Sequence, residues 1–134
     1  MRFTNKIRIL SILLTIFLIT IVWADSDPVL KKFSGIWEGS TVQESIPVDL
    51  TSTSGNGLFD FHFGPPYNCV LRAGEGREKD NSLILKILET SGNLKCDELW
   101  NGTIVLNKPD DDHIDIRIED ENGNPEDQAR LKKK

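Results

Sequence analysis

The chain has 134 residues, of which 38% are hydrophobic and 28% are charged, and its formal net charge at pH 7 is −5. This length suffices for one small domain and is too short for two. Because the chain is acidic and has no stripe of basic residues interleaved with aromatic ones, we expect no nucleic-acid partner.

Residues 1–24 predict a secretory signal peptide. Three basic residues precede an apolar run from Ile9 to Trp23, and Val22 and Ala24 supply the small residues of a cleavage site. An uncleaved membrane anchor is the alternative, because this run of 15 residues lies between a signal core and the roughly 20 residues of a spanning helix. Both place the following chain outside the cytoplasm. We expect a bacterial periplasmic or secreted protein without stable membrane insertion after cleavage.

Cleavage leaves 110 residues, divided into a short segment 25–32 and a single domain 33–134. The leader removes three of the 16 basic residues, so 13 remain against 21 acidic ones and the net charge becomes −8. We interpret this charge as a means of solubility. An acidic docking face is the alternative.

Cys69 and Cys96, 27 positions apart, predict a structural disulfide in an exported chain. In the chain-entropy model, closing a loop of this length stabilises the folded state by about 3–4 kcal/mol. A zinc site needs four converging ligands, whereas the two cysteines and two histidines here are far apart in the sequence, and no Cys-x-x-Cys motif indicates a redox role. Free thiols or an intermolecular link are the alternatives.

Short runs of alternating apolar and polar residues, separated by Gly, Asn, Asp and Pro, predict an all-β domain. In chain order the expected strands are Phe33–Gln43, Ile46–Leu50, Phe59–Phe63, Tyr67–Ala73, Ser82–Glu89, Trp100–Leu106, His113–Glu119 and Gln128–Lys132. Without helical crossovers, about eight strands form an antiparallel meander. We expect a barrel-like closure, because it removes exposed edges, with a β-sandwich as the alternative.

Three further expectations concern individual segments. Ser82–Glu89 is apolar on both sides, which is typical of a strand covered on both faces. The strand Trp100–Leu106 is expected to place Trp100, Gly102, Ile104 and Leu106 on one side. Gly74–Asn81 is predicted to be a mobile polar loop, and Ser54–Gly57 a hairpin turn.

The segment Gly35-Ile36-Trp37-Glu38-Gly39 resembles the Gly-x-Trp entry strand of lipocalin-like (calycin-like) barrels. In those families the tryptophan packs across one end of the barrel, which is the role the resemblance implies for Trp37. Together with Cys69, Cys96 and the strand Gly102–Leu106, this start is similar to small exported bacterial β domains of uncharacterised function. The resemblance implies an architecture and no settled chemistry.

Trp37, Tyr67 and Trp100 are candidate contacts for a ligand or partner, because aromatic rings with a polar group are favoured where a pocket meets water. Filling of the core is the alternative role for the same rings. The acidic runs Asp110–Asp112 and Asp120–Asn124 do not match a calcium-binding loop, so we interpret them as turns and expect no metal.

The sequence has no Gly-x-Ser-x-Gly elbow, no His-Glu-x-x-His pair and no glycine-rich phosphate loop. We therefore expect no enzyme and no cofactor, and we interpret His62 as a surface residue. The leading hypothesis is an exported, non-catalytic binding domain whose partner is another envelope or secreted protein. One alternative is a carrier of a small apolar ligand. Another is a periplasmic inhibitor of a hydrolase such as lysozyme, because the size, the acidity and the cysteine pair of this chain are similar to those of such inhibitors. The third is a hydrolase with an unfamiliar site.

Overall fold

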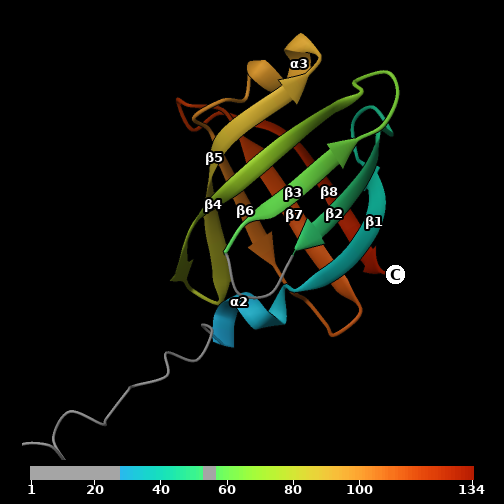
Figure 1. Cartoon of the computed structure of the whole chain (residues 1–134). Coiled ribbons are helices and arrows are strands. Elements are labelled where there is room, and N and C mark those ends of the chain that lie inside the picture. Colours follow the sequence, from blue (N-terminus) through green and yellow to red (C-terminus); the bar gives the residue numbers. More distant parts are fainter. Residues whose placement is uncertain (1–27, 53–56) are drawn as a thin grey trace, which may run out of the picture.

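The computed structural model of the protein describes residues 28–52 and 57–134 (Figure 1). The predicted signal peptide and most of the predicted turn at Ser54–Gly57 lie outside these residues. The described elements are α2 (Pro28–Lys32), β1 (Gly35–Thr41), β2 (Pro47–Ser52), β3 (Phe59–Phe63), β4 (Cys69–Lys79), β5 (Ser82–Gly92), α3 (Leu94–Asp97), β6 (Thr103–Asn107), β7 (His113–Glu119) and β8 (Pro125–Lys133).

The strands of the described residues form a closed barrel in the order of the sequence. Each strand is antiparallel to its neighbours, and β1 closes the barrel by pairing with β8 from Trp37↔Lys133 to Thr41↔Ala129. This arrangement confirms the predicted antiparallel meander and shows that it closes into a barrel and does not pack as a sandwich. Closure gives each described strand a hydrogen-bonded neighbour on both sides, and Figure 1 shows β4 and β5 as a long hairpin.

Alternation along the strands builds the core. In β3, Phe59, Phe61 and Phe63 are buried while His62 between them is exposed, and β7 repeats the pattern with its three isoleucines. The interior of a barrel of this size is just wide enough for its own side chains. The largest fully buried side chains are Trp37, Leu50, Phe59, Phe61, Leu71, Leu83, Leu85, Ile87, Ile104, Leu106, Ile114 and Ile118.

The prediction of a mobile loop at Gly74–Asn81 is wrong, because β4 continues to Lys79 and pairs with β5 as far as Lys79↔Ser82. The register shifts between Arg72 and Ala73 and again between Gly74 and Arg77. Residues 75–79, the outer half of β4, are exposed and polar. Their composition therefore resembles that of a loop. The turn itself consists of Asp80 and Asn81, whose φ values of 51° and 64° suit a tight two-residue hairpin.

The prediction for Ser82–Glu89 is correct for one face of the strand and only partly correct for the other. Leu83, Leu85 and Ile87 are buried in the core, whereas Ile84 and Leu88 on the outer face are half-buried. Neighbouring parts of the surface therefore cover this outer face incompletely.

The predicted start of β6 at Trp100 is also wrong, because the strand begins at Thr103. Trp100 is 55% exposed and lies in a turn that ends at Asn101, whose φ is 65°. Gly102 follows where the chain approaches the backbone closely, since a Cβ there would lie 2.3 Å from the carbonyl oxygen of Glu119. This turn rotates Trp100 away from the side that Ile104 occupies.

The two helices of the described residues, α2 and α3, lie at opposite ends of the barrel (Figure 1). At the α2 end, Leu30 packs against the core and Phe33 is buried. Trp37 is also buried, and the Nζ atoms of Lys108 and Lys133 lie 5.6 and 5.7 Å from its ring. The segment 25–32 thus contributes α2 as a cover for this end of the core.

Candidate functional site

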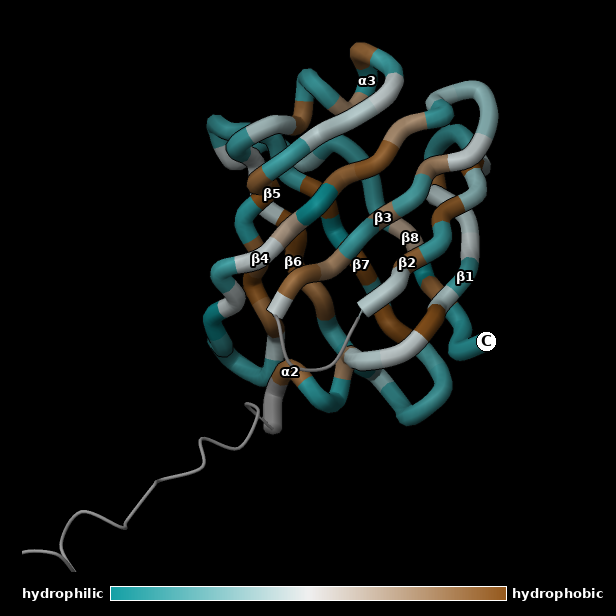
Figure 2. Tube along the Cα trace, viewed as in Figure 1, coloured by the Kyte–Doolittle hydropathy of each residue, from teal (hydrophilic) through white to brown (hydrophobic). Residues whose placement is uncertain are grey.

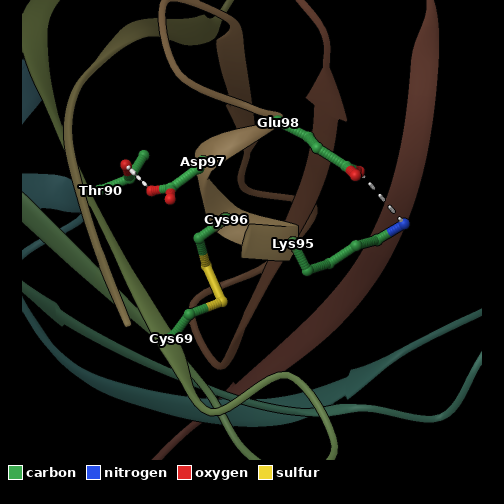
Figure 3. Close-up of a disulfide and its surroundings, with 6 residues drawn as sticks. All are labelled: Cys69, Thr90, Lys95, Cys96, Asp97 and Glu98. Atoms are coloured by element: carbon green, nitrogen blue, oxygen red, sulfur yellow. Dashed lines mark hydrogen bonds and ion pairs between the residues drawn. A yellow bond between two sulfur atoms is a disulfide. The ribbon is translucent and has the colours of Figure 1, made fainter. Parts of the chain in front are cut away.

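A disulfide between Cys69 and Cys96 anchors α3 to the barrel, as predicted (Figure 3). It joins the first residue of β4 to the third residue of α3, and both cysteines are buried. A second link comes from the Thr90 hydroxyl, which donates a hydrogen bond of 2.6 Å to Asp97 Oδ1. These two contacts hold a helix of only four residues, which has no side-chain hydrogen bond at its N-cap.

Gly92 allows the chain to turn from β5 into α3 beside the disulfide. Its φ is 98°, and a Cβ at this position would lie 2.6 Å from the Asn68 carbonyl oxygen and 2.9 Å from Cys69 Cα. Glycine is therefore required here both by conformation and by the close approach of the neighbouring strand.

A pocket of about 110 Å³ opens at the α3 end of the barrel. Its apolar part comes from Phe63, Cys96, Leu99 and Ile118. The connection after β1, the connection after β3, the α3 segment and the start of β8 supply its polar part, which consists of Gln43, Glu44, Tyr67, Lys95, Glu126 and Asp127. The pocket thus combines an apolar lining with a largely acidic rim.

Tyr67 is half-buried and is the aromatic side chain that faces the polar part of the pocket. Its hydroxyl donates a hydrogen bond to Glu44 Oε2, and its ring centre lies 6.3 Å from that of Phe63. Lys95 Nζ lies over the Tyr67 ring, 5.5 Å from the ring centre. Burial and the hydrogen bond to Glu44, together with the charges of Glu44, Asp127 and Glu98, raise the pKa of Tyr67 to about 12.

This shift predicts a measurable loss of stability at alkaline pH. The folded protein holds the phenol proton more tightly than the unfolded chain, whose pKa is 10.0, so the stabilisation is complete below pH 10.0 and is lost as the pH rises to about 12. Tyr67 is the chain's sole tyrosine, so the ultraviolet absorbance of tyrosinate reports it directly. We expect a midpoint near pH 12 in native protein and near 10.0 in urea. Equal midpoints in the two states would contradict the contact with Glu44.

Acidic side chains are concentrated at the α3 end. Within the described residues, the connections at this end and the start of β8 carry a single basic side chain, that of Lys95. The acidic side chains in the same segments are Glu44, Asp97, Glu98, Asp120, Glu121, Glu126 and Asp127. Backbone and side-chain donors of Asn124, with the Asn122 N–H, lower the pKa of Asp120, so this carboxylate stays ionised to a lower pH than an ordinary aspartate.

The opposite end has no such imbalance. Its described connections and the final residue carry four basic and four acidic side chains, which are Lys31, Lys32, Lys108, Lys134, Asp80, Asp110, Asp111 and Asp112. Among the described connections, the excess of negative charge is therefore concentrated at the α3 end of the barrel, where it produces a negative electrostatic field.

The structure separates the three aromatic residues that the sequence singled out. Trp37 lies in the core at the α2 end, where its Nε1 has no hydrogen-bond partner among the described residues. Tyr67 and Trp100 lie at the α3 end, and of the three only Tyr67 lines the pocket described above. Sequence reasoning missed Glu44, Lys95 and Asp127. For Glu44 and Asp127 the only signal was the acidity of the connections, and Lys95 had none.

Two apolar side chains are exposed on the α3 segment. Leu94, the first residue of the helix, is 74% exposed, and Trp100, which follows the helix, is 55% exposed. Figure 2 shows hydrophobic (brown) colour on the outermost part of this segment, next to hydrophilic (teal) neighbours. Apolar patches rimmed by polar residues mark protein–protein contacts, and tryptophan is enriched among the residues that dominate binding there.

The interior around Phe61 is filled by side chains. Trp37, Phe59 and Phe61 are at most 1% exposed and belong to one continuous core cluster. The pocket at the α3 end, at about 110 Å³, is smaller than the roughly 300–1,000 Å³ of sites for small-molecule ligands. Among the described residues, no group of three or more His, Cys, Asp or Glu is placed to hold a metal ion.

The fold and this site define a class: a small, closed, antiparallel β-barrel with a filled core and an acidic end that a disulfide anchors. No family model, curated protein or solved structure matches the chain. In residues 28–52 and 57–134, no helix has the length and apolar character that crossing a membrane requires.

Proposed function

We propose that this protein is a non-catalytic binding domain that acts outside the cytoplasm, in the periplasm or the extracellular medium, and contacts another protein through the α3 end of its barrel. The observation that carries the proposal is the coincidence, at this end, of the acidic field, the pocket and the exposed apolar side chains of Leu94, Trp100 and Val42. The acidity that the sequence suggested as a means of solubility becomes, in this proposal, part of a docking face.

Export is supported by the disulfide. Disulfides persist in oxidising compartments and are rare in the cytosol, so Cys69–Cys96 fits the signal peptide that residues 1–24 predict. The barrel is then the folded part that reaches the partner.

The charge of the α3 end specifies the partner's surface. Seven carboxylates beside one lysine attract a basic surface, accelerate its approach and repel an acidic one. Trp100 and Leu94 then supply apolar contact area, and tryptophan is among the residues that most often dominate binding energy. The expected partner is a protein with a positively charged patch around an apolar depression.

A carrier of apolar ligands has less support. Such a protein needs a ligand-sized void, whereas Phe59 and Phe61 are packed in the core and Leu30 and Phe33 cover the α2 end. An inhibitor of a basic hydrolase is one member of the proposed class. Assaying lysozyme activity in the presence of the purified domain tests that narrower possibility.

The proposal is tested by capture from envelope extract with three forms of the domain. In one variant, Leu94→Ser and Trp100→Ser remove the two exposed apolar groups of the α3 segment and leave Val42, the exposed apolar residue after β1, in place. The control, Ile36→Ser, changes a side chain of β1 that is 50% exposed near the opposite end. We expect wild type and control to recover the same partner equally and the double variant to recover about tenfold less. Recovery of no partner, or equal recovery by all three forms, would contradict the proposal.

A further inference from the structure

The pocket beside Tyr67 has the size of a side-chain group. Its volume of about 110 Å³ exceeds the roughly 10–15 Å³ that one water molecule needs and lies well below that of sites for whole small molecules. Phe63, Leu99 and Ile118 offer an apolar wall, while the carboxylates of Glu44 and Asp127 lie at the rim. A long aliphatic stem that ends in a positive charge fits such a lining.

The protein itself already places a cation at this pocket. Lys95 lines the pocket, and its Nζ lies 5.5 Å from the centre of the Tyr67 ring. Its ion-pair partner, Glu98, is 4.0 Å away and exposed, and the Lys95 side chain is itself 40% exposed (Figure 3). Exposed ion pairs and exposed cation–π contacts are each worth about 1 kcal/mol or less, so a better cation can displace this one.

We infer that this pocket receives the positively charged side chain of an arginine or lysine of the partner, and that Lys95 occupies the Tyr67 ring in the unbound protein. Arginine is the better occupant, because a planar guanidinium stacks on an aromatic ring and donates paired hydrogen bonds to a carboxylate such as Glu44 or Asp127. The inference deepens the proposed function and rests on it.

The test measures binding of a fluorescently labelled tri-arginine peptide by anisotropy at low ionic strength. Lys95→Met removes the competing cation and keeps an apolar stem. Lys86→Met is the matched control, because Lys86 is exposed on the wall of β5 and its loss changes the net charge equally. We expect Lys95→Met to lower the Kd about threefold below that of the control. Equal Kd values for the two variants would overturn the inference, because they would show attraction by net charge alone.

A second pair of variants tests the ring. Tyr67→Leu removes the aromatic face and is expected to raise the Kd about threefold, whereas Tyr67→Phe keeps the face and frees Glu44, so it should bind at least as well as wild type. Equal weakening by both would overturn the role of the ring. If these tests fail while the Leu94/Trp100 variant still loses its partner, the α3 end binds without this pocket. If that variant keeps its partner, the proposed function itself is wrong.

Discussion

Replacing both Cys69 and Cys96 by alanine is expected to lower the free energy of unfolding by about 3–4 kcal/mol. The disulfide closes a loop across 27 positions, and its loss gives back conformational freedom to the unfolded chain. For a domain of this size the melting temperature should fall by roughly 15 °C or more. Chemical denaturation in urea, monitored by tryptophan fluorescence, measures the difference.

Reduction supplies the control for this prediction. A thiol reductant should destabilise the wild type by a similar amount and leave the double alanine variant unchanged. Because α3 depends on Cys96 and on the Thr90–Asp97 hydrogen bond, we also expect the variant to bind partner more weakly at moderate temperature. A variant as stable as the wild type would show that packing alone holds the α3 end.

Phe61→Ala is expected to lower the free energy of unfolding by about 3–5 kcal/mol, an effect as large as that of losing the disulfide. Phe61 is 0% exposed at the centre of β3, so its removal leaves a cavity inside a barrel that has little room to collapse. A cavity of this kind stays dry and takes up small apolar molecules such as benzene. Benzene should therefore raise the melting temperature of the variant and leave that of the wild type unchanged.

His62→Ala is the matched control for this substitution, because His62 is the next residue of β3 and is exposed. We expect its effect to stay within about 0.5 kcal/mol. Stabilisation of the wild type by an apolar probe would reveal a hollow interior and would favour the carrier hypothesis over the binding domain.

The strands were predictable because burial on one face imposes a period of two. His113–Glu119 and Phe59–Phe63 occur at the predicted positions, since their apolar residues alternate without interruption. The outer half of β4 and the helix α3 were missed for a common reason, namely that neither is specified by a buried face of its own. Pairing with β5 extends β4, and the disulfide with the Asp97 hydrogen bond fixes α3.

The candidate site was only partly predictable. Tyr67 was selected as an aromatic residue with a polar group, which is a property of the residue alone. Glu44, Lys95 and Asp127 come from three separate segments, and their meeting at one pocket follows from the closure of the barrel. Likewise, composition shows that the chain is acidic, but only the strand order places so many carboxylates at one end.

Binding through the α3 end is tested most directly by a map of amide chemical shifts of the labelled domain during titration with the tri-arginine peptide. We expect saturable shifts confined to the α3 end, around Glu44, Tyr67, Lys95 and Asp127, with the core strands and the α2 end unchanged. Shifts that centre on the α2 end, or that spread evenly over both ends, would contradict the claim that this barrel binds through its α3 end.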